Sequence, residues 1–146
     1  MGLVVCATRG GKGSQVAQQA AINRARENGD RLLFLYVVQV DEPDGFDVSL
    51  RPALREELAR LGQTLLRLAK QRSRLAGVFA DTLILEGDAR EAILAQLRRQ
   101  SAECLYLGAP ARSARQTEPT NIELLAQQIQ AETAVRVEVV YPPSEV

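Results

Sequence analysis

The sequence predicts an α/β fold built on a doubly wound, five-stranded parallel sheet. Short, wholly apolar segments alternate with amphipathic helical segments along the chain, and one strand segment, the last, alternates apolar with polar residues. Strands buried on both faces are typical of parallel sheets, whereas alternation is typical of a strand with one face in water. A chain of 146 residues can bury one core, so we expect a single domain over residues 1–146.

The first strand–helix–strand unit is the clearest part of this pattern. Leu3–Ala7 is an apolar run too short for a helix, and residues 32–38 form a second such run, LLFLYVV. Between them, residues 15–28 carry an apolar stripe at helical spacing, followed by Gly29 where a helix would end. Two doubly buried strands joined by a helix are expected to pair in parallel.

An acidic loop and a long helix follow the second strand. Residues 41–49 (DEPDGFDVS) contain proline and glycine, which is typical of a loop. We expect Ser49 to cap the helix, Pro52 to lie in its first turn and Gly77 to follow its end. One helix face, expected to pack on the sheet, carries Leu54, Leu58, Leu61, Leu65 and Leu68. A coiled coil is the alternative, but its heptads would have to extend further.

The second half of the chain repeats the alternation of strand and helix. Strands are predicted at residues 82–85 and 104–107. Asp88 and Thr120 are predicted N-caps, because each is followed three residues later by a glutamate, as in a capping box. Residues 135–139 read VRVEV, which predicts a strand at the edge of the sheet.

Composition excludes several kinds of function. Eighteen basic side chains balance eighteen acidic ones, so we expect no nucleic-acid partner and no membrane surface. The chain has no histidine and no spaced cysteine pair, which excludes zinc-finger-type sites. Cys6 and Cys104 lie in apolar runs and are expected to be buried thiols. With no charged leader and no run of membrane length, we expect the protein in the cytoplasm.

The most informative segment is the turn from the first strand to the first helix, where sheets of this type bind ligands. It consists of Thr8, Arg9, Gly10, Gly11, Lys12, Gly13 and Ser14. Three glycines permit positive φ and can aim successive amides into one hollow, while two cations and a helix N-terminus attract an anion. Ser14 is expected to donate to the ligand or to cap the helix. We expect phosphate or carboxylate to bind here; the alternative is a turn that needs glycine only for its shape.

The order of elements, the long second helix, Gly87-Asp88 after the third strand and Gly108 after the fourth resemble the universal stress protein family over essentially the whole chain. The resemblance implies a Rossmann-like fold of the adenine nucleotide alpha hydrolase type, with strand order 3-2-1-4-5. It also implies a homodimer through the last strand, residues 135–140. Some members of the family bind ATP and others do not.

The resemblance also implies where a nucleotide would lie. ATP-binding members have Gly-x2-Gly-x9-Gly-Ser/Thr after the fourth strand and an aspartate at the end of the first. Gly108 matches the first glycine, whereas the other motif positions carry Ala111, Asn121 and Ile122, and Thr8 stands near the place of the aspartate.

Three more candidates follow from the family's topology. The fourth strand would lie beside the first, so Arg112 and Arg115 are expected near the glycine-rich turn, where they could pair with a polyphosphate. Solvated loop arginines are the alternative for each. Val38 ends the second strand, where family members hold the adenine, and ordinary core is its alternative.

We therefore expect a non-catalytic regulatory or stress-response module that binds a nucleotide or another phosphorylated ligand. No motif assigns a cofactor, and the ligand that the resemblance implies is ATP or another adenine nucleotide. A ligand-free dimeric interaction protein is the alternative. An enzyme is not expected, because the chain has neither histidine nor a Gly-x-Ser-x-Gly elbow. In the expected dimer Arg136 meets Glu138 across an antiparallel junction; a monomer whose charges protect that edge is the alternative.

Overall fold

The computed structural model describes residues 2–111 and 118–143. Its elements in chain order are β1 (Leu3–Ala7), α1 (Lys12–Asn28), β2 (Arg31–Val38), the 3-10 turn η1 (Val48–Leu50), α2 (Arg51–Leu75), β3 (Ala80–Glu86), α3 (Ala89–Gln100), β4 (Cys104–Gly108), α4 (Asn121–Glu132) and β5 (Arg136–Val140). All neighbouring strands pair in parallel, in the order β3-β2-β1-β4-β5. The predicted sheet and strand order are confirmed, and β5 lies at an edge.

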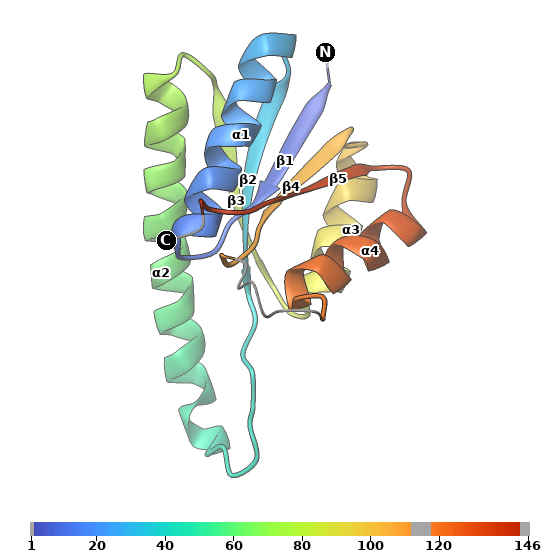
Figure 1. Ribbon diagram of the computed structural model, residues 1–146. Helices are drawn as coiled ribbons and strands as arrows, with labels where there is room; N and C mark the ends of the chain where they lie inside the picture. The colour runs from blue at the N-terminus through green and yellow to red at the C-terminus, as the bar shows by residue number, and fades with distance from the viewer. Residues whose placement is uncertain (1, 112–117, 144–146) are drawn as a thin grey trace.

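Two helical layers enclose the sheet. Helices α1 and α2 cover one face, and α3 and α4 cover the other (Figure 1). Successive residues of a strand point to opposite faces, so Val4 and Cys6 pack with α1 and α2 while Leu3 and Val5 pack with α3 and α4. This double burial explains why the central strands β1 and β4 are apolar throughout, and β2 from Leu32 onward.

Three predicted helix ends are present. Gly29 ends α1 in the left-handed conformation, with φ at 68°. The side chain of Asp88 accepts a hydrogen bond from the amide of Glu91 at 3.1 Å and so caps α3. Thr120 and Glu123 form a complete capping box at the start of α4. These caps satisfy amides that have no acceptor one turn earlier.

The entry into α2 differs from the prediction that Ser49 caps it. Asp47 is the cap instead: its Oδ1 accepts from the amide of Ser49 at 3.0 Å and from its hydroxyl at 2.7 Å. These bonds start η1 and lower the pKa of Asp47 below its ordinary value. Helix α2 then begins at Arg51, with Pro52 in its first turn as expected.

The predicted leucine face of α2 packs on the protein only in part: Leu58 and Leu65 lie against the core, but the most buried side of the helix is a different one. The buried residues of α2 are Gly62, Leu66, Ala69 and Ser73. Gly62 lies against the ring of Tyr36, and any side chain there would clash with it. Three small residues let the helix approach the sheet closely, which leaves Leu61 and Leu68 about half exposed at 48% and 49%.

The two cysteines are buried and form no disulfide, as expected. Burial raises the pKa of the Cys6 thiol to about 12. Within residues 2–111 and 118–143, no helix combines the length and the apolarity needed to cross a membrane.

Candidate functional site

The glycine-rich turn is shorter than the sequence predicts. Helix α1 begins at Lys12 rather than at residue 15, so Gly13 and Ser14 lie in its first turn. Three glycines permit positive φ in this segment, but within the turn Gly11 alone adopts it, with φ at 109°. The turn therefore needs glycine for its backbone conformation at one position, Gly11.

Ser14 closes the turn onto itself. Its Oγ accepts a hydrogen bond from the amide of Arg9 at 2.9 Å, and the side chain is 5% exposed. Ser14 is therefore not the N-cap, which is Gly11. The amide of Arg9 is satisfied within the protein, so donors to a ligand would have to come from the residues that follow it.

Gly13 and Gly108 have a packing role. A Cβ on Gly108 would lie 2.6 Å from the amide nitrogen of Ser14, and a Cβ on Gly13 would lie 2.9 Å from the carbonyl carbon of Ala109. Both distances are too short for real contacts. The first turn of α1 thus lies directly on the end of β4. This contact brings the glycine-rich turn close to the segment that follows β4.

Thr8 lies below the turn and faces the protein interior. It is 2% exposed, and its Oγ1 accepts a hydrogen bond from the side-chain Nε2 of Gln18 at 2.5 Å. Gln18 is also buried, and its Oε1 accepts from the guanidinium of Arg72 on α2 at 2.6 Å. This chain of hydrogen bonds joins the end of β1 to α1 and α2.

Two adjoining hollows lie at the carboxyl edge of the sheet. The first, here called the apolar cleft, has a volume of about 270 Å³ and opens among β1, β2, β4, α3 and α4. Its apolar walls include Leu35, Val37, Ile93, Leu107, Ile122 and Leu125. Thr8, Gln39 and Asp41 add polar groups. Apolar walls with a few polar groups are typical of sites for small organic ligands.

The second hollow, here called the turn hollow, has a volume of about 320 Å³. It is lined by residues 9–14 and by Gly108, Ala109, Pro110, Ala111 and Pro142. The exposed residues Arg9 and Lys12 bring two cationic side chains to it. Arg9, Gly10 and Gly108 line both hollows, so the two lie next to each other at these residues.

Gln39 fixes one wall of the apolar cleft. Its Oε1 accepts from the amide of Ala89 at 2.7 Å, and its Nε2 donates to Asp41 at 3.1 Å. A further bond, from the amide of Gly87 to the carbonyl of Val38 at 3.0 Å, joins the same two segments. The end of β2 is thereby tied to the start of α3.

Most of the predicted site residues lie together. Thr8, Gly108 and the segment 9–14 surround the two hollows, with Thr8 in the floor of the apolar cleft. Val38 does not join them: it is 3% exposed and packs in the core beneath α1 and α2, because adjacent strand residues point to opposite faces. Arg112 and Arg115 lie outside the described residues.

Sequence reasoning missed the helical walls of the apolar cleft. Ala89 and Ile122 lie in the first turns of α3 and α4, and Leu125 lies one turn further along α4. A helix that follows a parallel strand starts at the carboxyl edge, so first-turn apolar residues were the available signal. In the described part of the chain, no three acidic, cysteine or histidine side chains gather as a metal site would require.

Residues 1–118 match the model of the universal stress protein family. The chain belongs to the universal stress protein family. The resemblance of its element order and glycine positions is therefore confirmed. No curated protein sequence matches the chain significantly.

Solved structures of universal stress proteins share the fold over nearly the whole length. A family protein from Burkholderia pseudomallei is 22% identical, with a TM-score of 0.68 over 97% of this chain and 96% of that one. A universal stress protein in complex with cAMP is 16% identical, with a TM-score of 0.70 over 97% and 98%. An Arabidopsis thaliana family protein with AMP bound is 13% identical, with a TM-score of 0.66 over 99% and 94%.

Proposed function

We propose that this universal stress protein is a non-catalytic, single-domain regulatory module that binds an adenine nucleotide. The base would occupy the apolar cleft and the phosphate would lie at the turn hollow. The observation that carries this proposal is that the two hollows lie side by side and share Arg9, Gly10 and Gly108 in their linings. An apolar cavity that opens onto cations and a helix N-terminus matches a ligand with a flat base at one end and phosphate at the other.

Relatives with the same fold support this choice of ligand, since two of them were solved with AMP and with cAMP. The donors at the turn support it as well. The amides at the start of α1 have no carbonyl one turn earlier to bond, and they carry the positive end of the helix dipole. Arg9 adds an exposed positive charge that lines both hollows.

Calorimetric titration with ATP, ADP, AMP, cAMP and adenosine tests the proposal. We expect heat with at least one nucleotide and weaker binding of adenosine. Ala89→Phe, which would fill the apolar cleft, and Arg9→Gln should each weaken binding about tenfold or more. The matched controls are Ala131→Phe and Arg26→Gln, at exposed positions away from both hollows. No heat with any nucleotide would contradict the proposal.

A non-catalytic role is proposed because the site offers little acid–base chemistry. The sequence contains no histidine. Of the acidic residues, Asp41 lines the cleft, and it already accepts a hydrogen bond from Gln39. Incubation with ATP should leave the nucleotide intact over hours at micromolar protein. Steady turnover that Asp41→Asn abolishes would show that the site is catalytic.

A ligand-free interaction protein is the second candidate, and one observation favours it. The positions of the family's glycine motif carry Ala111, Asn121 and Ile122, and Ile122 is a wall of the apolar cleft. Protein purified without added nucleotide and then denatured distinguishes the two candidates. Release of a stoichiometric adenine nucleotide would exclude the ligand-free protein, whereas its absence together with silent titrations would favour it.

We also propose a homodimer through the free edge of β5. The amide of Arg136 and the carbonyl of Val140 both bond toward the body of the sheet, so the backbone groups of Val137 and Val139 point outward. Arg136 and Glu138 form an ion pair within one chain at 2.7 Å, which leaves them able to exchange partners across a twofold axis. Sedimentation should give at least twice the chain mass of 16.0 kDa.

A further inference from the structure

Exposed apolar side chains are concentrated along α2. Seven large hydrophobic residues are exposed in the described part of the chain, and one of them, Leu124, lies on α4. The other six lie on α2 or close to its ends: Val48, Leu50, Leu61, Leu68, Leu75 and Phe79. Clustering of this kind on one element is typical of an interaction surface, whereas scattered exposed leucines are not.

Four leucines of α2 recur at intervals of seven residues: Leu54, Leu61, Leu68 and Leu75. Here they are called the leucine ridge. Residues seven apart lie on nearly the same side of a helix and drift slowly around it, as in helices that pair with a second helix. The sheet contacts a different side, through Gly62, Leu66 and Ala69. Leu61 and Leu68 are therefore left about half exposed, and Leu75 is 79% exposed.

The charges beside the ridge divide into two halves. Residues 41–62, which comprise the acidic loop and the amino-terminal half of α2, carry six acidic and three basic side chains. Residues 63–75, the carboxyl-terminal half, carry four basic side chains and no acidic one. One long helical surface thus has a negative end and a positive end.

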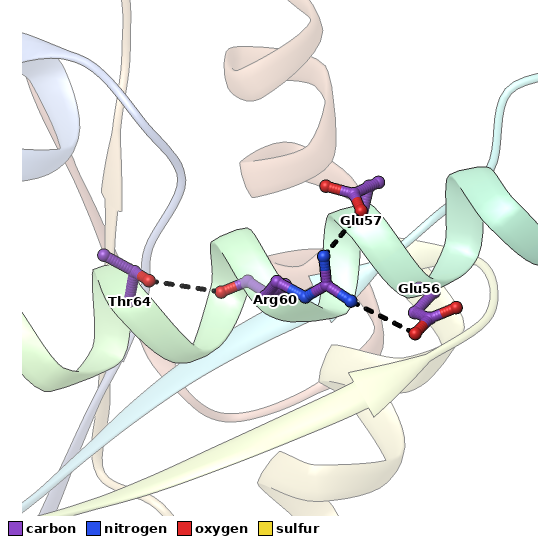
Figure 2. A network of polar contacts seen from close by, with 4 residues as sticks. All are labelled: Glu56, Glu57, Arg60 and Thr64. Atoms are coloured by element: carbon purple, nitrogen blue, oxygen red, sulfur yellow. Dashed lines mark hydrogen bonds and ion pairs between the residues drawn. The ribbon is translucent and has the colours of Figure 1, made fainter.

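The three cations of the amino-terminal half are already paired. Arg60 lies between Glu56 and Glu57, at 3.1 and 2.8 Å, while the Thr64 hydroxyl donates to the Arg60 carbonyl (Figure 2). Arg51 and Arg55 pair with Glu42 and Glu86. By contrast, Arg67, Lys70 and Arg74 have no acidic partner among residues 2–111 and 118–143.

We propose that the leucine ridge binds the leucine ridge of a second copy of this chain, with the two α2 helices antiparallel. Only the antiparallel direction places the acidic half of each helix beside the basic half of the other, at both ends of the contact. A parallel pair would bring the two unpaired basic halves together. The surface is self-complementary in both apolar spacing and charge, as an isologous twofold interface requires.

The fold leaves this surface accessible. The amino-terminal half of α2 projects beyond the carboxyl edge of the sheet, alongside the loop that descends from β2 (Figure 1). A twofold axis passing beside Thr64 would set Leu61 against Leu68 of the second copy, and Leu54 against its Leu75. This interface is separate from the β5 edge. Strand β5 lies at one end of the sheet, whereas α2 packs on β2 and β3 at the other end.

Disulfide trapping tests the direction and the register. Thr64→Cys should form a covalent dimer under mild oxidation, because the two residues meet at the axis. Gln71→Cys lies two turns further along the same exposed side, and in an antiparallel pair its mate is about 20 Å away, so it should remain monomeric. Cys6 and Cys104 are buried and give little background. Failure of Thr64→Cys to cross-link, or equal cross-linking of Gln71→Cys, would overturn the proposal.

Sedimentation equilibrium tests the apolar contact. In a Val139→Pro background, which removes β5 pairing, the chain should still form dimers. Leu61→Gln with Leu68→Gln should raise the dissociation constant at least tenfold, whereas Leu124→Gln, on α4, should not change it. Far-ultraviolet circular dichroism should show unchanged helix in all three. A mass that does not differ between the double variant and its control would overturn the proposal.

A charge exchange tests whether the charges of the two halves hold the copies together. A chain with Arg67→Glu and Arg74→Glu, and a second chain with Asp44→Lys and Glu57→Lys, should each associate weakly with themselves. Mixed together they should form a heterodimer, because both ends of the contact again join opposite charges. Failure of the mixture to associate more tightly than either variant alone would contradict the charge pairing on which the interface rests.

Discussion

Gly13 and Gly108 lie in such close contact that a single methyl group cannot be added to either of them. The Cβ of an alanine at position 108 would lie 2.6 Å from the amide nitrogen that follows Gly13. This contact sets how near the first turn of α1 comes to the end of β4. Gly108 also lines both hollows, so the same contact fixes a part of the wall that the apolar cleft and the turn hollow share.

Gly13→Ala should lower the free energy of unfolding by about 1–3 kcal/mol, because the added methyl group would push α1 away from Ala109. Urea unfolding followed by circular dichroism measures the change. Gly10→Ala is the matched control: nothing lies within 4 Å of its Cβ and its φ is negative or extended, so the substitution should be neutral. Equal losses for the two variants would show that the contact is not the cause.

Thr8→Val should destabilise the protein by about 1–3 kcal/mol, because it leaves the buried side-chain amide of Gln18 without its acceptor. Urea denaturation compares this variant with Thr64→Val, whose hydroxyl is exposed on α2 and should matter little. Adding Gln18→Leu to Thr8→Val should recover part of the loss. A double variant that is as unstable as the sum of both changes would argue against a coupled pair.

The thiol of Cys6 predicts a dependence of stability on alkaline pH. Burial raises its pKa from 9.0 to about 12, so the unfolded chain loses the thiol proton first as the pH rises. The contribution of the neutral thiol is complete below pH 9 and declines by about 1.4 kcal/mol per pH unit up to pH 12. Between pH 8 and pH 10, the stability difference between wild type and Cys6→Ala should shrink by about that amount. A constant difference would be inconsistent with the raised pKa.

Val139→Pro should prevent pairing through β5 without unfolding the sheet. The amide of Val139 points to the free edge, whereas its neighbours bond toward β4, so proline removes no bond of the β4–β5 ladder. The mass measured by sedimentation should then fall, because the β5 contact is lost. Val137→Thr, which keeps the outward amide, is the control. A mass unchanged by the proline would exclude β5 as an interface.

Much of the fold could be predicted from periodicity and caps. The strand runs were recognisable because a parallel sheet buries every residue, and Asp88 and Thr120 were recognisable because capping depends on local spacing. The face of α2 was predicted only in part, since Leu58 and Leu65 pack against the core but Leu61 and Leu68 are half exposed. Hydrophobicity alone favoured Leu61 and Leu68, whereas the sheet selected Gly62 and Ala69, whose small size allows a close approach.

The candidate site was predictable in position but less so in geometry. Topology places the first turn of α1 at the carboxyl edge of the sheet, so residues 8–14 could be named. Sequence could not show that Ser14 bonds to Arg9 or that Gly13 serves packing, because both depend on where β4 ends. It could not separate Val37 from Val38 either, since a shift of one residue exchanges the two faces of a strand.

The bond between the hydroxyl of Ser14 and the amide of Arg9 has a consequence for affinity. A loop that must become ordered on binding loses conformational entropy at that moment, and its affinity falls accordingly. Here the bend is already held by the chain's own groups, at 2.9 Å. An arriving anion would meet amides that are oriented in advance, so the empty and occupied forms should share one backbone shape.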